Sequence, residues 1–180
     1  MSPLPADLGR GGALRQLALE DLDEIWALVE AERDRIAVWL PWVDATKTIG
    51  DQRRWLEGVL ADHRNLEGCG IFVDGAYAGG VGLSLDPYGV IGEIGYWIGS
   101  AHEGRGFVTA ATRALIEIGF GELSLHKIVI HAGVDNLRSR AIPERLGFTQ
   151  EGILREEGLG AIGFYDSVVY GLLAREWTGR

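Results

Sequence analysis

Hydrophobic and polar residues along this chain alternate with two different periods. In the first third, a short apolar run over 13–18 predicts a strand, and two segments with apolar side chains at helical spacing follow it. The first helix is expected to begin at Glu20 and Asp21, and the second to cover 51–63, with acidic residues at its start. The chain therefore opens with a strand and two amphipathic helices.

The middle of the chain carries apolar runs of strand length. Three of them cover 71–73, 77–85 and 90–98. Turn residues such as Asp74-Gly75 separate these runs, which predicts an antiparallel meander. Helical spacing then returns over 108–118, and a buried strand is expected over 127–134. Such a strand, helix, strand crossover places its two strands parallel.

The last quarter predicts one short helix and a final pair of strands. The helix is expected over 136–146 and ends at Gly147, a residue type that favours helix C-termini, and Phe148 starts the strands. The whole pattern predicts a mixed α+β fold. Its central sheet would have about seven strands, mostly antiparallel with one parallel pair, and helices on both faces.

Length and composition set the domain organisation. A chain of 180 residues with 47% hydrophobic content suits one domain, expected over 13–180 after a flexible leader over 1–12 that is rich in Pro and Gly. No apolar run approaches the roughly 20 residues of a membrane span, so no membrane partner is expected. The net charge of −9, from 17 basic and 26 acidic residues, argues against nucleic-acid binding.

Few residues suggest metal or thiol chemistry. Cys69 is the single cysteine and is interpreted as a small buried hydrophobe, which fits a reducing cytoplasm. The spacing of His102, His126 and His131 matches no metal-ligand motif, so no metal is expected.

A glycine-rich loop lies between a predicted strand and a predicted helix, over 102–109. Gly104 and Gly106 let successive backbone N–H groups converge, and the helix that follows adds its positive N-terminal end. The loop could hold a pyrophosphate or could be only a tight connection. It lacks the Lys-Ser/Thr of a P-loop NTPase and the spacing of a dinucleotide-binding fold.

Several segments together carry a family resemblance. They are Trp39-Leu40-Pro41-Trp42-Val43-Asp44, Gly95-Tyr96-Trp97-Ile98, the loop 103–109, Asn136-Leu137-Arg138-Ser139, Glu144-Arg145-Leu146-Gly147-Phe148 and Tyr165-Asp166-Ser167-Val168-Val169-Tyr170. In this order they resemble the GNAT superfamily of N-acetyltransferases, and within it the RimJ/RimL branch that contains the ribosomal-protein-serine N-acetyltransferases. The resemblance covers nearly the whole chain.

The resemblance implies a binding site for acetyl-CoA as co-substrate. In such proteins two parallel strands splay apart, pantetheine pairs with one of them, and the pyrophosphate lies on the loop. The residues implied are Trp97, Ile98, Glu103, Gly104, Arg105, Gly106, Phe107, Val108, Thr109, Asn136 and Ser139. The family loop usually has Gln or Arg in place of Glu103, and a carboxylate there would repel phosphate unless it turns away. Arg105 could offset part of that charge.

Amide formation requires a neutral amine and a protonated leaving thiolate. Glu93 is the candidate base, because it precedes the strand that should lie at the thioester; an exposed strand-edge residue is the alternative. Glu156 or Glu157 is a second option for the base, which solvent could also supply. Ser139 is the candidate hydroxyl for the thiolate, with helix capping as its alternative role.

Three functions remain open, two enzymatic ones that differ in the acceptor amine and one without catalysis. The leading hypothesis is direct transfer of acetyl, in a ternary complex, to the N-terminal α-amine of a protein that begins with Ser or Thr. The others are acetylation of a small amine (an antibiotic, polyamine or amino acid) and acyl-CoA sensing without catalysis. Trp39 and Trp42 are expected to line the substrate pocket or to cover the core. A homodimer is compatible with the sequence.

Overall fold

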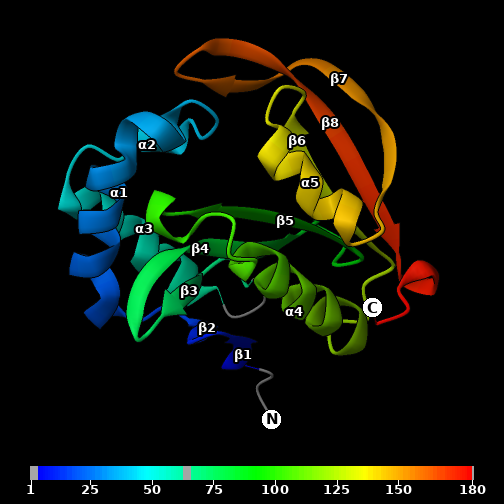
Figure 1. Ribbon diagram of the computed structural model, residues 1–180, viewed down its shortest axis with the longest axis horizontal. Helices are drawn as coiled ribbons and strands as arrows, with labels where there is room; N and C mark the ends of the chain where they lie inside the picture. Colours follow the sequence, from blue (N-terminus) through cyan, green and yellow to red (C-terminus); the bar gives the residue numbers. More distant parts are fainter. Residues whose placement is uncertain (1–3, 63–65, 180) are drawn as a thin grey trace.

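One mixed sheet organises the molecule (Figure 1). The computed structural model describes residues 4–62 and 66–179. Within them eight strands form one sheet in the order β1-β2-β3-β4-β5-β6-β8-β7, and all neighbours are antiparallel except β5 and β6. The strands are β1 Ala6–Gly9, β2 Gly12–Gln16, β3 Cys69–Val73, β4 Ala76–Leu85, β5 Ile91–Ile98, β6 Lys127–Gly133, β7 Thr149–Gly160 and β8 Gly163–Leu173. This is the predicted mixed fold.

Helices cover both faces of the sheet, as the periodicity predicts. They are α1 Leu22–Ala37, α2 Trp42–Ala45, α3 Ile49–Ala61, α4 Phe107–Gly121 and α5 Leu137–Arg145. The apolar stripe of α4, with Leu115 and Ile116 fully buried, packs on one face in the largest core cluster. On the other face α1 and α3 bury Ile25 and Leu56 against Phe72 and its neighbours.

The two parallel strands separate along their length. β5 pairs with β6 only from Ile91 and Lys127 to Glu93 and Val129. From residue 94 onward β5 pairs with β4 alone, while β6 stays paired with β8 as far as Gly133. The β6-facing edge of β5 over 94–98 therefore has no strand partner among the described residues. The Ile98 carbonyl at its end accepts a hydrogen bond from Arg35, and the rest of this edge is open to a ligand. The splayed pair implied by the family resemblance is present.

The expected flexible leader is wrong for residues 6–12. β1 pairs antiparallel with β2 there, with Ala6 opposite Leu14 and Asp7 opposite Ala13. Gly9, Arg10 and Gly11 have φ values of 72°, 55° and 77° and make the turn between the strands. Glycines that suggested looseness instead supply the left-handed conformations of a hairpin, and β1 is the strand beyond the predicted seven. Residues 1–3 and the expected helix end at residue 63 lie outside the described residues.

The segment between the first two long helices contains the short helix α2. Pro41 stands before its first turn, a position where a missing N–H costs nothing. α3 then begins with a capping box, in which Thr48 Oγ1 accepts from Asp51 N at 3.2 Å and Asp51 Oδ2 accepts from Thr48 N at 2.8 Å. These contacts fix where α3 starts against the sheet.

Candidate active site

The glycine loop leads directly into α4. Gly104 and Gly106 have φ values of 70° and 85°, and Gly106 is the N-cap of the helix. A Cβ placed on either glycine would meet no atom within 4 Å, so the space beside the loop is open. The first N–H groups of a helix lack partners inside it, and they concentrate positive potential at this opening. The loop therefore fits an anion such as a pyrophosphate.

Side chains in this loop mostly face away from the opening. Phe107 is 2% exposed and Val108 is 9% exposed, and both belong to the main core cluster. Thr109 Oγ1 accepts a hydrogen bond from Arg145 at 3.2 Å. The guanidinium of Arg105 lies over the Phe107 ring, 4.9 Å from its centroid. Because the apolar side chains Phe107 and Val108 are buried in the core, they leave the backbone amides of the loop accessible to a phosphate.

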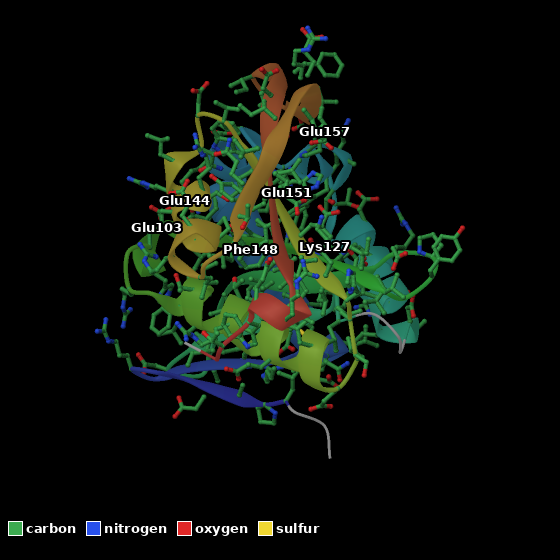
Figure 2. The ribbon with its side chains drawn as sticks, turned by 90° about the vertical axis from the view of Figure 1, so that its right-hand side faces the viewer. Glu103, Lys127, Glu144, Phe148, Glu151 and Glu157 are labelled. Carbon is green, nitrogen blue, oxygen red and sulfur yellow. The ribbon has the colours of Figure 1, made fainter. Side chains whose placement is uncertain are left out.

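Glu103 is held in an ion-pair cluster that the sequence did not reveal. Its Oε1 is 2.7 Å from Arg35 Nη1, and its Oε2 contacts Arg138. Arg35 belongs to α1 and Arg138 to α5, so the carboxylate bridges the two helices. Figure 2 labels Glu103 near α5. Two cations offset the repulsion expected between this carboxylate and phosphate. Arg105 was expected from the sequence to offset this charge, but its Nη1 lies 3.3 Å from His102 Nδ1 instead.

Ser139 lies across the splay from β5 and contacts Tyr96. Ser139 Oγ donates to the Tyr96 hydroxyl at 3.3 Å, and that hydroxyl donates to the Ser139 carbonyl at 3.0 Å. Asn136 caps α5, with its Oδ1 accepting from Ser139 N at 3.2 Å. Burial raises the pKa of Tyr96 far above its usual value, so the phenol keeps its proton. Two hydroxyls, not one, stand where the thioester sulfur is expected.

Sequence reasoning missed Tyr96 as a functional residue. It was read only as part of the Gly95-Tyr96-Trp97-Ile98 segment. Strand alternation was the available signal, because it places Tyr96 on the sheet face opposite Trp97, toward the main core cluster and α5.

A cavity of about 400 Å³ lies between the sheet and the helices α1, α2 and α3. Its walls come from α1, α2, α3, β3, β4 and β5, and most of them are apolar or aromatic. Glu93, Trp42 and Trp97 are among the lining residues, as are Gly95 and Tyr96. The cavity therefore reaches the stretch of β5 whose other edge is free.

Cys69 also lines this cavity and is inert. It is 1% exposed, and burial raises the pKa of its thiol to about 12. A thiol that stays protonated is a poor nucleophile, which confirms the interpretation of Cys69 as a small buried hydrophobe.

The structure separates the two tryptophans expected at the substrate pocket. Trp42 lines the cavity, with its ring centroid 6.2 Å from that of Trp97. Trp39 is not among the lining residues. Its ring lies edge-on to Tyr165 at 5.1 Å and packs so closely on Gly133 that a Cβ there would fall 2.5 Å from it. Trp39 thus packs against β6 and β8, next to Gly133 and Tyr165.

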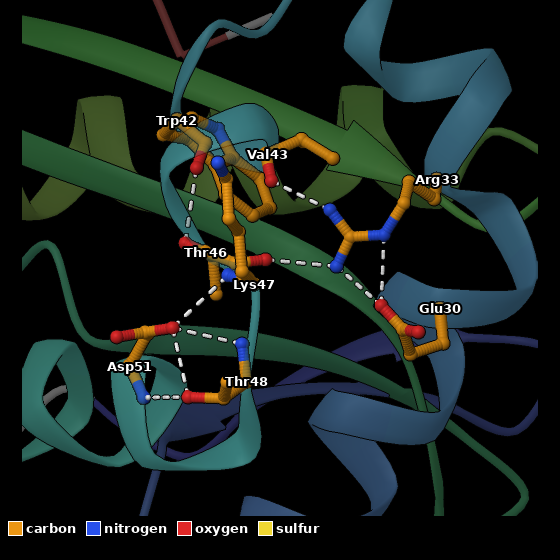
Figure 3. Close-up of polar contacts among 8 residues, drawn as sticks. All are labelled: Glu30, Arg33, Trp42, Val43, Thr46, Lys47, Thr48 and Asp51. Carbon is orange, nitrogen blue, oxygen red and sulfur yellow. Dashed lines mark hydrogen bonds and ion pairs between the residues drawn. The ribbon is translucent and has the colours of Figure 1, made fainter.

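Arg33 holds the segment that carries Trp42 (Figure 3). Its guanidinium donates to the Val43 carbonyl at 2.6 Å and to the Thr46 carbonyl at 2.8 Å, and it also contacts Glu30. Thr46 Oγ1 in turn donates to the Trp42 carbonyl at 3.0 Å. These bonds tie α2 to α1 and fix the wall of the cavity that Trp42 forms.

The two alternative bases lie apart from this cavity. Glu157 Oε2 is 3.2 Å from His131 Nδ1, a contact between β7 and β6 that Figure 2 places high on the β7 edge. Glu156 lies within the irregularity in β7 pairing between Leu154 and Gly158, has φ of 53°, and its N–H donates to Asp166 at 2.8 Å. Of the three carboxylates considered, only Glu93 lines the cavity.

Neither a metal centre nor a membrane span is present in the described part of the chain. Over residues 4–62 and 66–179, no three His, Cys, Asp or Glu side chains group closely enough to hold a metal ion. None of the described helices is long and apolar enough to cross a membrane.

Sequence comparison identifies the family. The profile of the family described as "Acetyltransferase (GNAT) domain" matches residues 13–149. The "Putative ribosomal N-acetyltransferase YdaF" of Bacillus subtilis (strain 168) is 38% identical over 175 residues, which cover 93% of this chain and 93% of that protein. The "Ribosomal-protein-serine acetyltransferase" of Escherichia coli (strain K12) is 26% identical over 146 residues, which cover 79% of this chain and 82% of that protein.

A solved structure extends the match to the bound co-substrate. The microcin C7 self-immunity acetyltransferase MccE, crystallised with acetyl-CoA and AMP, has a TM-score of 0.85 and 26% identity, with 96% of this chain and 97% of that chain covered. The splayed strands and the open glycine loop found here fit such a co-substrate. The chain belongs to the GNAT family, in its RimJ/RimL branch, and is an N-acetyltransferase that uses acetyl-CoA.

Proposed function

We propose that this enzyme acetylates the N-terminal α-amine of a protein, with Ser or Thr as first residue. The observation that carries the proposal is the position of the cavity. Its lining includes Gly95, Tyr96 and Trp97, the stretch of β5 whose β6-facing edge is free for pantetheine. An amine in the cavity and a thioester on the free edge would meet at this stretch, which favours direct attack in a ternary complex over a covalent enzyme intermediate.

Glu93 is proposed as the base. Acetyl-CoA supplies the activated acetyl group as a thioester. The enzyme has to remove a proton from the acceptor amine so that the amine is neutral and can attack. Glu93 lines the cavity at the last residue where β5 still pairs with β6, next to the point at which the strands separate. Its carboxylate accepts the amine proton directly or through water. A protein α-amine has a reference pKa near ~8, so modest assistance is sufficient.

Ser139 and Tyr96 are proposed to act on the leaving thiolate. Both hydroxyls lie on the α5 side of the splay and are bonded to each other. Ser139 Oγ donates a hydrogen bond to the sulfur as the C–S bond breaks. The Tyr96 phenol keeps its proton and holds Ser139 in place through the hydrogen bond to the Ser139 carbonyl. The N-cap Asn136 fixes α5, which carries the serine.

The relatives favour a protein acceptor. The names of YdaF and of the Escherichia coli protein both refer to ribosomal acetylation, and YdaF matches 93% of this chain. A small amine is the second candidate. It is favoured by the cavity itself, in which Trp42, Trp55 and Trp97 stand with Glu67 and Glu93, because aromatic rings and carboxylates suit a compact cation.

Thiol release from acetyl-CoA tests the proposal. The full chain is assayed against peptides with N-terminal Ser, Thr or Ala and against polyamines, aminoglycosides and free amino acids. We expect kcat/KM for the Ser and Thr peptides to exceed that for every small amine. A small amine that turns over faster than all peptides contradicts the protein-acceptor proposal.

Trp42→Ala is expected to raise the KM for the acceptor by about 10-fold, with little change in the KM for acetyl-CoA. The indole forms a cavity wall on the acceptor side of β5, so its removal enlarges that side alone. Trp39→Phe is the control, because Trp39 packs beside Gly133 and Tyr165 outside the cavity. Equal increases in both KM values, together with a lower melting temperature, would show that Trp42 only stabilises the fold and does not bind the acceptor.

Ser139→Ala is expected to lower kcat by no more than about 10-fold. A thiol with a reference pKa near ~8.5 needs little protonation to depart, and the Tyr96 hydroxyl remains 3.3 Å from the lost oxygen's position. The double variant with Tyr96→Phe should lose more than the product of the two single effects, since it removes both donors. Strictly additive losses in log kcat, measured at saturating acetyl-CoA, would refute cooperation between the hydroxyls.

The proposed location is the cytoplasm. Cys69 is buried and free, which suits a reducing compartment.

A further inference from the structure

Arg138 stands at a position where a cation is unfavourable. It is the second residue of α5, whose first turn contains no acidic residue, and the positive end of a helix repels a positive side chain. The Arg138 side chain is 84% exposed, so packing does not hold it there. Its polar contact is between Nη1 and Glu103 Oε2. Over residues 4–62 and 66–179 its other N–H groups have no acceptor, which leaves them available to a ligand.

Arg35, the other cation on the Glu103 carboxylate, is fully engaged by the protein. Its Nε contacts Glu32, its Nη1 contacts Glu103, and its Nη2 donates to the Ile98 carbonyl. It also lies in the last turn of α1, where the helix end favours a cation. Contacts within the protein therefore account for Arg35. They do not account for a second cation, Arg138, on the same carboxylate at the start of a helix.

The shared carboxylate places Arg138 beside the glycine loop. Glu103 is the residue before Gly104, which has a φ of 70° and borders the open space at the start of α4. The ion pair also joins the two segments that leave the splayed strands, because β5 leads to Glu103 and β6 leads to α5. A phosphate held by the loop amides would therefore lie next to the Arg138 guanidinium. The loop would supply backbone donors, and α5 would supply a positive charge.

We propose that Arg138 binds the pyrophosphate of CoA through its free N–H groups, and that Glu103 positions it to do so. A planar guanidinium can give one edge to a carboxylate and another to a phosphate oxygen. A carboxylate that would by itself repel phosphate thus holds a cation against it. The inference concerns the co-substrate alone and does not depend on which amine is the acceptor.

Isothermal titration of the full chain with CoA tests the binding role. Arg138→Gln should weaken CoA binding by about 10- to 100-fold, the range for a hydrogen bond to a charged group. The affinity of this variant should also respond less to added salt, because one cation no longer faces the phosphates. An affinity within about twofold of wild type, the size expected for an exposed ion pair that touches no ligand, overturns the proposal.

Arg53→Gln is the matched control. Arg53 is 54% exposed on α3, on the sheet face opposite α4, and its Nη1 lies 4.0 Å from Glu57 Oε1. Its replacement removes the same charge from another exposed ion pair. The CoA affinity of this variant should stay within about twofold of wild type. A loss equal to that of Arg138→Gln would reduce both effects to net charge and contradict a direct contact.

Dephospho-CoA shows which phosphate is bound. It lacks the 3′-phosphate of CoA and keeps the pyrophosphate. Arg138→Gln should therefore weaken the binding of both ligands by the same factor. A loss that appears with CoA and vanishes with dephospho-CoA would move Arg138 to the 3′-phosphate and overturn its assignment to the pyrophosphate.

Glu103→Gln tests the positioning role, because the two effects of this carboxylate on CoA have opposite signs. The variant removes a charge that repels phosphate, but it also releases Arg138. We expect it to bind CoA about threefold more weakly than wild type, and yet to bind more tightly than its parent when made in the Arg138→Gln background. Arg35 is present in both backgrounds, so its contribution cancels from the comparison. The same change in affinity in both backgrounds would show that Glu103 does not position Arg138.

Discussion

Glu93→Gln is expected to lower kcat/KM by about 100-fold at pH 6.5 with an N-terminal peptide as acceptor. At that pH only roughly 3% of an α-amine with a pKa near ~8 is neutral, so most acceptor molecules need a base before they can attack. Positioned general bases typically contribute 10²- to 10⁴-fold. Gln keeps the size of Glu93 in the cavity wall and removes its ability to take a proton. The loss therefore reports proton transfer.

The sign of the pH dependence follows from the amine. As pH rises through ~8, the neutral fraction of the amine grows without help, and the variant gains rate faster than the wild type does. The ratio of wild-type to variant kcat/KM should fall from about 100 at pH 6.5 to below about 10 at pH 9. Acetyl-CoA is kept saturating at every pH, so that kcat/KM for the acceptor reports only the steps that involve the amine.

Glu156→Gln and Glu157→Gln are the matched controls. Both residues lie on β7 outside the cavity; the backbone N–H of Glu156 donates to Asp166, and the Glu157 carboxylate lies beside His131. Their variants should keep the wild-type pH profile. If Glu93→Gln matched the wild type at every pH while one of the β7 variants lost activity at low pH, the base would be that residue. If all three matched, solvent would be the base.

Periodicity predicted the elements of the fold because it records local burial. The stripe on α4 and the crossover from β5 to β6 followed from apolar spacing alone, and Gly147 marked the end of α5. The hairpin β1–β2 was missed because its turn is built from glycines that a composition argument reads as flexibility. Pairing with β2, and not the local sequence, determines the conformation of residues 6–9.

The geometry of the candidate site was predictable only where it depends on the backbone. The loop at Gly104 and Gly106 and the free edge of β5 have the geometry that the resemblance implies, since both depend on local motif and strand order. Glu103 could not be understood from sequence, because its partners lie 68 and 35 residues away on two helices.

The double variant Gly104→Val and Gly106→Val is expected to weaken CoA binding by at least about 100-fold. Both glycines have positive φ beside the open space at the start of α4, where a Cβ would meet no protein atom. Valine side chains would therefore stand in that space and keep a pyrophosphate from the backbone amides. Isothermal titration of the full chain with CoA measures the loss directly.

Positive φ also strains valine wherever it occurs, so the control must carry the same strain. Gly75 and Gly163, with φ values of 88° and 92°, stand at the turns of the β3–β4 and β7–β8 hairpins, and a Cβ on either would meet no atom within 4 Å. Replacing this pair by Val should lower the melting temperature about as much as the loop variant does, yet leave CoA affinity within about twofold of wild type. Loss of affinity confined to the loop variant assigns the pyrophosphate to the amides at α4. Unchanged affinity in the loop variant would place it elsewhere on the protein.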